Sequence, residues 1–315
     1  MVAHSTLGAL LIGYMLATPL YGITMLQAYQ YYHRFDRDST LLRSLIAIVV
    51  LFETLTQVFS SHVVYDFLVV QAGGPALSRF PWTLTFPVIL NASLGSITQL
   101  FFAWRVYIMS SKKLYLLVIV GGMSLAQLGF SFVVSIQGLE YPNLADVPAS
   151  SSWLTTLCFG LTAATDILVS SLLCYFLYVR KSGLIVTDSV VNKLIVLTIN
   201  NGLLTSVVAL IAFIACLTIP STMVPTASCF ILGKAYANTI LSSLNSRTRA
   251  RAHIGREIEL NDRRNKTLSL SFFSASRGRT DTSPSELELW KRNGSKLDEA
   301  NSGISVTRQV ETFTG

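Results

Sequence analysis

The sequence carries little charge. Asp, Glu, Lys and Arg make up 13% of its 315 residues, whereas hydrophobic residues make up 51%. Soluble globular domains usually contain about 25% charged residues. The apolar residues also gather in long runs separated by short polar breaks. The composition therefore excludes an ordinary soluble domain and predicts an all-α, polytopic integral membrane protein.

Cysteine and histidine are scarce, with four of each. No pair of cysteines has the CxxC-like spacing of a zinc site, and the histidines are spread over loops, helix ends and the tail. The cysteines all fall within apolar runs, at Cys158, Cys174, Cys216 and Cys229. We therefore expect small buried thiols, with no disulfide and no metal site.

Motifs of enzyme chemistry are also missing. The chain contains no nucleophile elbow, no phosphate-binding loop and no acyl-transfer motif. We therefore predict no enzymatic activity and no cofactor.

Seven apolar runs are each close to the ~20 residues that a helix needs to cross a bilayer. No basic segment precedes the first run, and this run is too long for the core of a signal peptide, so we expect a retained helix. Residues 1–6 then form a short extracellular N-terminus, and residues 7–244 form the membrane domain. The predicted spans are Leu7–Tyr29, Leu41–Val64, Trp82–Tyr107, Leu114–Ile136, Trp153–Tyr178, Asn192–Leu217 and Val224–Leu244.

Lys and Arg are distributed unevenly among the predicted loops. The first, third and fifth loops and the tail are basic, whereas the second loop contains only Arg79 and the fourth and sixth contain none. Basic loops remain cytoplasmic, so we predict an N-terminus outside and a C-terminus inside, in the plasma membrane. This topology accounts for much of the net charge of +7 and removes the need for a nucleic-acid partner.

The tail, residues 245–315, is basic and rich in Ser and Thr, and we predict that it is disordered and cytoplasmic. Basic residues just inside the last span attract anionic inner-leaflet lipids by about 1 kcal/mol each. A kinase acting on Ser276–Glu288 would weaken that attraction. The tail could also contact a signalling partner, or serve only as a solvated topogenic segment.

Polar residues recur four positions apart within the predicted spans, which places them on one helix face. Polar groups with unmet hydrogen bonds cannot face lipid cheaply, so we expect these faces to turn inward. The supporting polar seam comprises Gln57, Asn91, Gln99, Asn201 and Asn238. The first span instead carries a ridge of small residues, Ala9, Gly13 and Ala17, which favours close helix packing.

Three charged residues lie deep within the spans, at Glu53, Asp166 and Lys234, whereas the other charged residues of the spans lie at their ends. Each lies roughly 15–18 Å from the inner helix end, near the bilayer midplane. We expect the three to form one cluster. The cluster is either a buried ion pair that fixes helix packing or a hydrated site that contacts a ligand.

Four stretches together resemble a family of seven-helix membrane proteins of basidiomycete fungi whose domain has no assigned function. The stretches are Pro19–Asp38, Phe101–Ser110, Thr165–Gly183 and Leu232–Arg247. The resemblance covers Leu7–Arg251 and implies a fungal integral membrane protein with seven helices. It also implies a Lys and an Asn in the last helix, matched by Lys234 and Asn238, and an inner-end Arg in the third, matched by Arg105. No activity follows from the resemblance.

Three functions fit these features. A receptor-like or sensor-like protein fits the topology, the polar interior and the modifiable tail, although rhodopsin-like signatures such as an acid before Arg105 are missing. A small-solute transporter or channel is the alternative, although the first and last three spans show no internal repeat. A retinal protein would use Lys234 as its Schiff-base lysine with Glu53 or Asp166 as counterion, but no tryptophan lies at mid-membrane depth and the third span offers no carboxylate.

Overall fold

The structure of the chain is a computed structural model. It describes residues 2–36, 38–71, 81–141, 149–181, 185–219 and 222–246, together with residues 263 and 267. The chain divides into two units, Met1–Ile254 and Gly255–Gly315. The predicted basic tail lies almost wholly outside the described residues, and so does the part of the second loop that contains Arg79.

Helices account for nearly all of the first unit, and no strand occurs in the described ranges. The helices are α1 (Val2–Arg34), α2 (Thr40–Tyr65), η1 (Asp66–Val70), η2 (Trp82–Leu84), α3 (Thr85–Met109), α4 (Leu114–Glu140), α5 (Ala149–Val179) and α6 (Ile185–Thr218). Residues 224–246 form a further helix, which we refer to as the central helix. Among the described residues, six helices are long and apolar enough to cross a membrane. The chain is therefore a polytopic helical membrane protein, as its composition predicts.

Several helices extend beyond the apolar runs that predict them. Helix α1 starts at Val2 and ends at Arg34, whereas the first run covers Leu7–Tyr29, and α6 starts at Ile185 instead of Asn192. The apolar run marks the ~30 Å hydrocarbon layer, but the headgroup regions add about 10–15 Å in which a helix can continue. Residues 2–6 accordingly continue α1 instead of forming a separate segment.

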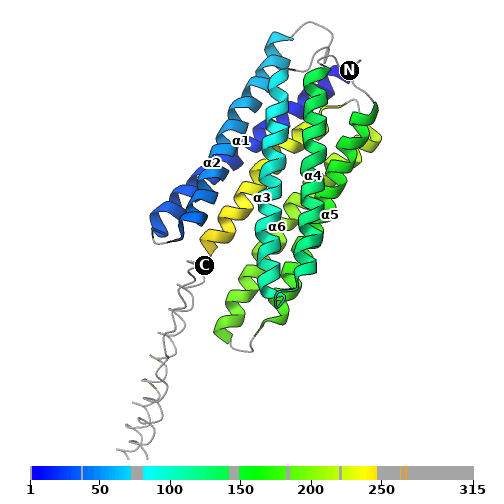
Figure 1. Cartoon of the computed structure of the whole chain (residues 1–315). Coiled ribbons are helices and arrows are strands. Elements are labelled where there is room, and N and C mark those ends of the chain that lie inside the picture. The colour runs from blue at the N-terminus through cyan, green and yellow to red at the C-terminus, as the bar shows by residue number, and fades with distance from the viewer. Residues whose placement is uncertain are drawn as a thin grey trace, which may run out of the picture. The chain divides into compact units, whose positions relative to one another are not determined.

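The helices pack side by side, as Figure 1 shows. Each helix from α1 to α6 contacts the next one in the sequence, and α3 also contacts α5. The central helix, yellow in Figure 1, is enclosed by the others, and none of its residues is exposed. A helix surrounded by protein can carry polar groups on every side, provided that neighbouring helices supply hydrogen-bond partners. The central helix is therefore where polar contacts between the helices converge.

Small residues allow the central helix to approach its neighbours closely. A Cβ atom built on Gly13 of α1 would lie 2.6 Å from the Cβ of Ala227, so only glycine fits this crossing. A Cβ atom on Gly233 would overlap the side chain of Asn91 on α3. The small-residue ridge predicted in the first span thus packs against the central helix at Gly13.

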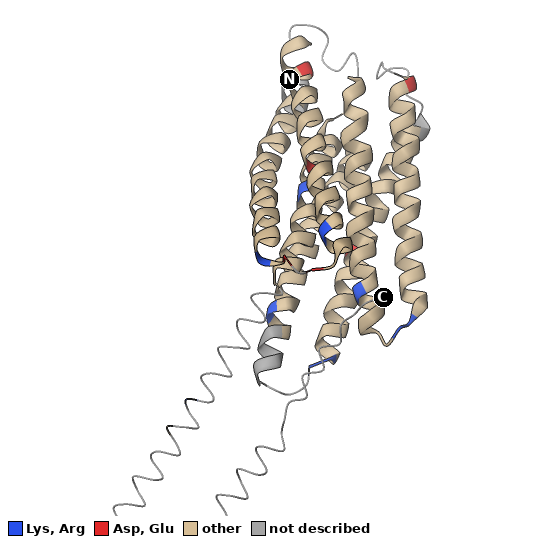
Figure 2. Cartoon of the chain, turned by 60° about the vertical axis from the view of Figure 1, so that its left-hand side comes forward, with Lys and Arg blue, Asp and Glu red and all other residues tan. Residues whose placement is uncertain are grey.

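Charged residues gather mainly at the helix ends, as Figure 2 shows. The lipid-facing surfaces are apolar, with exposed side chains such as Leu16, Val58 and Leu203. In contrast, Glu53, Asp166 and Lys234 are 0%, 5% and 1% exposed, respectively. These three residues are thus enclosed by the helices and do not face the lipid.

Candidate functional site

Lys234 and Glu53 form a buried ion pair between the central helix and α2. The Nζ atom of Lys234 lies 2.8 Å from Oε2 of Glu53 and also donates a hydrogen bond of 3.1 Å to the Glu53 carbonyl oxygen. The same Nζ atom lies 5.2 Å from the centroid of the Tyr21 ring on α1. A carboxylate, a carbonyl and an aromatic face thus surround the lysine charge and replace its hydration.

Asp166 has different partners. Its Oδ1 accepts a hydrogen bond of 3.0 Å from Nε2 of Gln99 on α3, and its Oδ2 accepts one of 2.8 Å from the hydroxyl of Tyr236. In the described part of the chain, Asp166 forms no ion pair, and Lys234–Glu53 is the one salt bridge. The structure therefore divides the three charges into a pair and a separate carboxylate network.

Helix geometry explains this division. Lys234 and Tyr236 are two positions apart, so their side chains point in directions ~200° apart around the helix axis. Lys234 faces α1 and α2, whereas Tyr236 faces α3 and α5. Equal depth in the membrane thus does not bring Asp166 and Lys234 together, because they lie on opposite sides of the central helix.

Two amides of the predicted polar seam lie on the Lys234 side of the central helix. Nδ2 of Asn238 donates hydrogen bonds to the carbonyl oxygens of Leu20, at 3.0 Å, and Lys234, at 2.8 Å. Nε2 of Gln57 donates to the hydroxyls of Tyr14, at 3.2 Å, and Thr18, at 3.3 Å. These bonds tie α1 to the central helix and to α2 around the ion pair.

The other three amides lie on the Asp166 side. Asn91 donates to the carbonyl oxygen of Cys229 at 2.9 Å, and Asn201 donates to the hydroxyl of Ser242 at 2.9 Å. Gln99 bonds not only to Asp166 but also to Oε1 of Gln127 on α4, at 3.3 Å. The central helix is therefore bonded to α3 and α6, and the Asp166 network reaches α4.

A cavity of about 290 Å³ lies between α3, α4, α5, α6 and the central helix, toward the end of the helices where α3 and α5 begin. We refer to it as the large cavity. The described part of its polar wall consists of hydroxyls, amides and thiols, and none of the described lining residues is Asp, Glu, Lys, Arg or His. Among these residues, Oδ1 of Asn91 and Oγ of Ser135 are buried and have no hydrogen-bond partner in the described ranges. The described wall can thus offer hydrogen bonds but no charge to a ligand.

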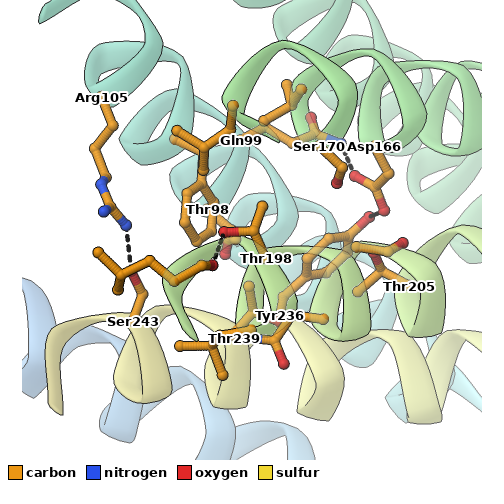
Figure 3. Close-up of a pocket in the computed structure, with 17 residues that line it drawn as sticks. Thr98, Gln99, Arg105, Asp166, Ser170, Thr198, Thr205, Tyr236, Thr239 and Ser243 are labelled. Carbon is orange, nitrogen blue, oxygen red and sulfur yellow. Dashed lines mark hydrogen bonds between the residues drawn. The ribbon is translucent and has the colours of Figure 1, made fainter. Parts of the chain in front are cut away.

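A second cavity, of about 40 Å³, lies toward the opposite end of the helices, and Figure 3 shows its wall. We refer to it as the small cavity. Asp166 and Tyr236 line one part of it, and Arg105 of α3, which hydrogen-bonds to the Ser243 hydroxyl, lines another. Tyr236 lines both cavities, so its contact with Asp166 lies at the boundary between them.

Three of the four cysteines line the large cavity, although the sequence predicted thiols that serve only as small buried side chains. These are Cys158 of α5, Cys216 of α6 and Cys229 of the central helix, all partly exposed and unpaired. Their positions in three different helices give no spacing signal that sequence inspection could detect. Tyr236 was also missed, although a tyrosine at mid-membrane depth usually needs a partner for its hydroxyl.

Part of the chain matches a known protein family in sequence. The profile of a family described as "Family of unknown function (DUF6534)" matches residues 162–249. No curated protein and no solved structure matches the chain. The matched segment contains Asp166, Asn201, Lys234, Tyr236 and Asn238, and so carries both the ion pair's lysine and the Asp166 network. Over this segment, the chain is similar to a family of unknown function.

Proposed function

We propose that this protein is a receptor-like seven-helix membrane protein that binds a small neutral molecule in the large cavity. The observation that carries the proposal is the cavity itself. Ligand pockets are usually about 300–1,000 Å³ in volume and combine an apolar wall with a few convergent polar groups. At about 290 Å³, with hydroxyls, amides and thiols and no charged group among its described lining residues, the large cavity suits a small uncharged ligand.

The proposed topology has seven spans, with the central helix as the seventh. In its support, residues 224–246 are long enough for the ~20 residues of a crossing, and the helix is enclosed by spanning helices. The bias of basic residues in the loops favours an N-terminus outside and a C-terminus inside. With that orientation the large cavity faces the outside. The resemblance to basidiomycete proteins favours a fungal membrane as its location, and we propose the plasma membrane.

A polar path links the large cavity to the opposite end of the helices and supports a receptor role. A ligand that bonds to Tyr236 in the large cavity competes for the hydroxyl that now holds Asp166. Asp166 lines the small cavity together with Arg105, which is bonded to the central helix at Ser243. Ligand binding can therefore shift the packing of the central helix at its cytoplasmic end, where a kinase, a signalling partner or anionic lipids would contact the tail.

The ligand proposal can be tested by thermal unfolding of the full chain in lipid nanodiscs. The probes are small neutral molecules: aliphatic alcohols, diols, amides and lactones. Ser135→Leu fills the large cavity, and Ser171→Leu makes the same change at an exposed position of α5. We expect at least one probe to stabilise the wild type and the Ser171 variant but not the Ser135 variant. If no probe stabilises the wild type, or if the Ser135 variant responds equally, the proposed site is wrong.

A small-solute transporter is the second candidate, and the two cavities favour it. They lie toward opposite ends of the helices, and Tyr236 lines both, so a small movement of this side chain could connect them. Uptake of radiolabelled neutral solutes into proteoliposomes tests this function. Transport by the wild type that is altered at least severalfold by Tyr236→Ala would favour the transporter. Binding in nanodiscs without uptake would favour the receptor.

A further inference from the structure

Asp166 is a buried carboxylate with no cationic partner among the described residues. It is 5% exposed and lies at mid-depth in α5, whereas the other buried carboxylate, Glu53, is paired with Lys234. A buried carboxylate is very unfavourable within a membrane unless a positive charge compensates it. The contrast between the two acids raises the question of what balances the charge of Asp166.

The hydrogen bonds at Asp166 match the ionised form of its side chain. One carboxylate oxygen accepts from Gln99 and the other from Tyr236, as Figure 3 shows. An ionised carboxylate accepts hydrogen bonds at both oxygens, whereas a protonated one must also donate. The amide and the phenol contribute dipoles but no net charge. The negative charge therefore remains to be balanced.

The small cavity presents oxygen atoms beside this carboxylate. Thr205 of α6 lines the cavity near Asp166, and its hydroxyl lies 3.2 Å from the carbonyl oxygen of Gly202, to which it donates a hydrogen bond. A hydroxyl that donates its hydrogen keeps its lone pairs, so the Thr205 oxygen remains available to a cation. Thr198, about 10 Å along α6 from Thr205, lines the part of the cavity toward Arg105. Ser170 also lines the cavity.

Gln99 adds a further oxygen to this wall. Its Oε1 atom is buried and accepts no hydrogen bond within the described ranges, and the residue is 2% exposed. The Nε2 atom of the same amide is committed to Asp166 and Gln127. Gln99 thus lines the cavity and leaves one buried oxygen without a partner, whose partial negative charge also favours a cation nearby.

We propose that Asp166 and the oxygen atoms lining the small cavity bind a monovalent cation such as Na⁺. The volume of about 40 Å³ is enough for an ion together with water, since one water needs about 10–15 Å³. A single carboxylate among neutral oxygens favours a single positive charge, because Ca²⁺ and Mg²⁺ sites usually supply more anionic ligands. Arg105 lies two turns further along α3 than Gln99, so the Asp166 part of the cavity is its negative end.

The test is thermal unfolding of the full chain in nanodiscs made of neutral lipid, in NaCl, LiCl, KCl or choline chloride at equal ionic strength. We expect one inorganic cation to raise the unfolding temperature in a saturable manner, by about 5–10 °C at a hundred times its dissociation constant. Asp166→Asn should abolish the rise. Asp66→Asn, an acid-to-amide change at a residue that bonds to Gln71 outside the cavity, should retain it.

Two further variants keep the test decisive if Asp166→Asn does not fold. Ser170→Ala and Thr205→Val each remove one cavity oxygen near Asp166 and should raise the cation concentration at half-effect about tenfold. The proposal is overturned by equal unfolding temperatures in all four salts or by an unchanged response in these variants. It does not depend on the neutral ligand of the large cavity, whose own test uses the Ser135 variant.

Discussion

Replacement of Lys234 by Met should destabilise the protein strongly, and the loss should be recovered by a second change at Glu53. Lys234 is 1% exposed and bonds to both the side chain and the carbonyl oxygen of Glu53. Methionine retains much of the length of lysine but no charge. The Lys234→Met variant therefore leaves a fully buried carboxylate without a counterion.

The magnitude follows from the burial of both partners. Removal of one member of a buried ion pair costs about 3–5 kcal/mol, whereas replacement of both members by neutral groups of similar volume is often close to neutral. The hydrogen bond to the carbonyl oxygen adds about 1 kcal/mol to the loss in any variant that lacks Lys234. We therefore expect the Lys234→Met/Glu53→Gln double variant to lie within about 2 kcal/mol of the wild type, so that the double change costs at least about 5 kcal/mol less than the sum of the two single changes.

The assay is reversible unfolding in mixed micelles with increasing SDS, followed by circular dichroism, for the wild type, both single variants and the double variant. Lys193→Met serves as a control, because this lysine of α6 is exposed and the same chemical change should have little effect. Single variants as stable as the wild type would contradict a structural pair and indicate a strained site in which Lys234 contacts a ligand. A double variant as unstable as the sum of the singles would show that the two charges are not coupled.

Three further predictions concern the packing and the two cavities. Gly13→Ala should destabilise the protein, because the added Cβ would lie 2.6 Å from the Cβ of Ala227. Gly22→Ala, where no atom lies within 4 Å of the added Cβ, should be neutral or stabilising by up to about 1 kcal/mol. Thermal unfolding of the two variants tests this difference. Tyr236→Phe should cost about 1.5–3 kcal/mol, because it removes a donor from the buried Asp166 carboxylate, and SDS unfolding should detect the loss. A hydrophilic methanethiosulfonate reagent, followed by peptide mass spectrometry, should modify the cysteines that line the large cavity but leave Cys174, which lines neither cavity, unmodified.

Composition and hydropathy were sufficient to identify the class of protein and most of the helices. Apolar runs near 20 residues with few charges can satisfy their backbone groups in lipid only as helices, so composition and spacing are sufficient. The same reasoning identified Glu53, Asp166 and Lys234, because charges are rare and costly at mid-membrane depth. The helix ends were less predictable, as α1 and α6 show, because helical hydrogen bonding continues into the headgroup region, where hydropathy no longer marks it.

Which of these residues contact one another depends on the packing of the helices. Depth along a helix can be counted from the sequence, but the direction of a side chain depends on how neighbouring helices are rotated and packed. Lys234 and Tyr236, two residues apart, consequently face opposite sides of the central helix, so Glu53 pairs with one and Asp166 with the other. The cavities depend on the same packing, since their walls combine residues from four or five helices that share no spacing in the sequence.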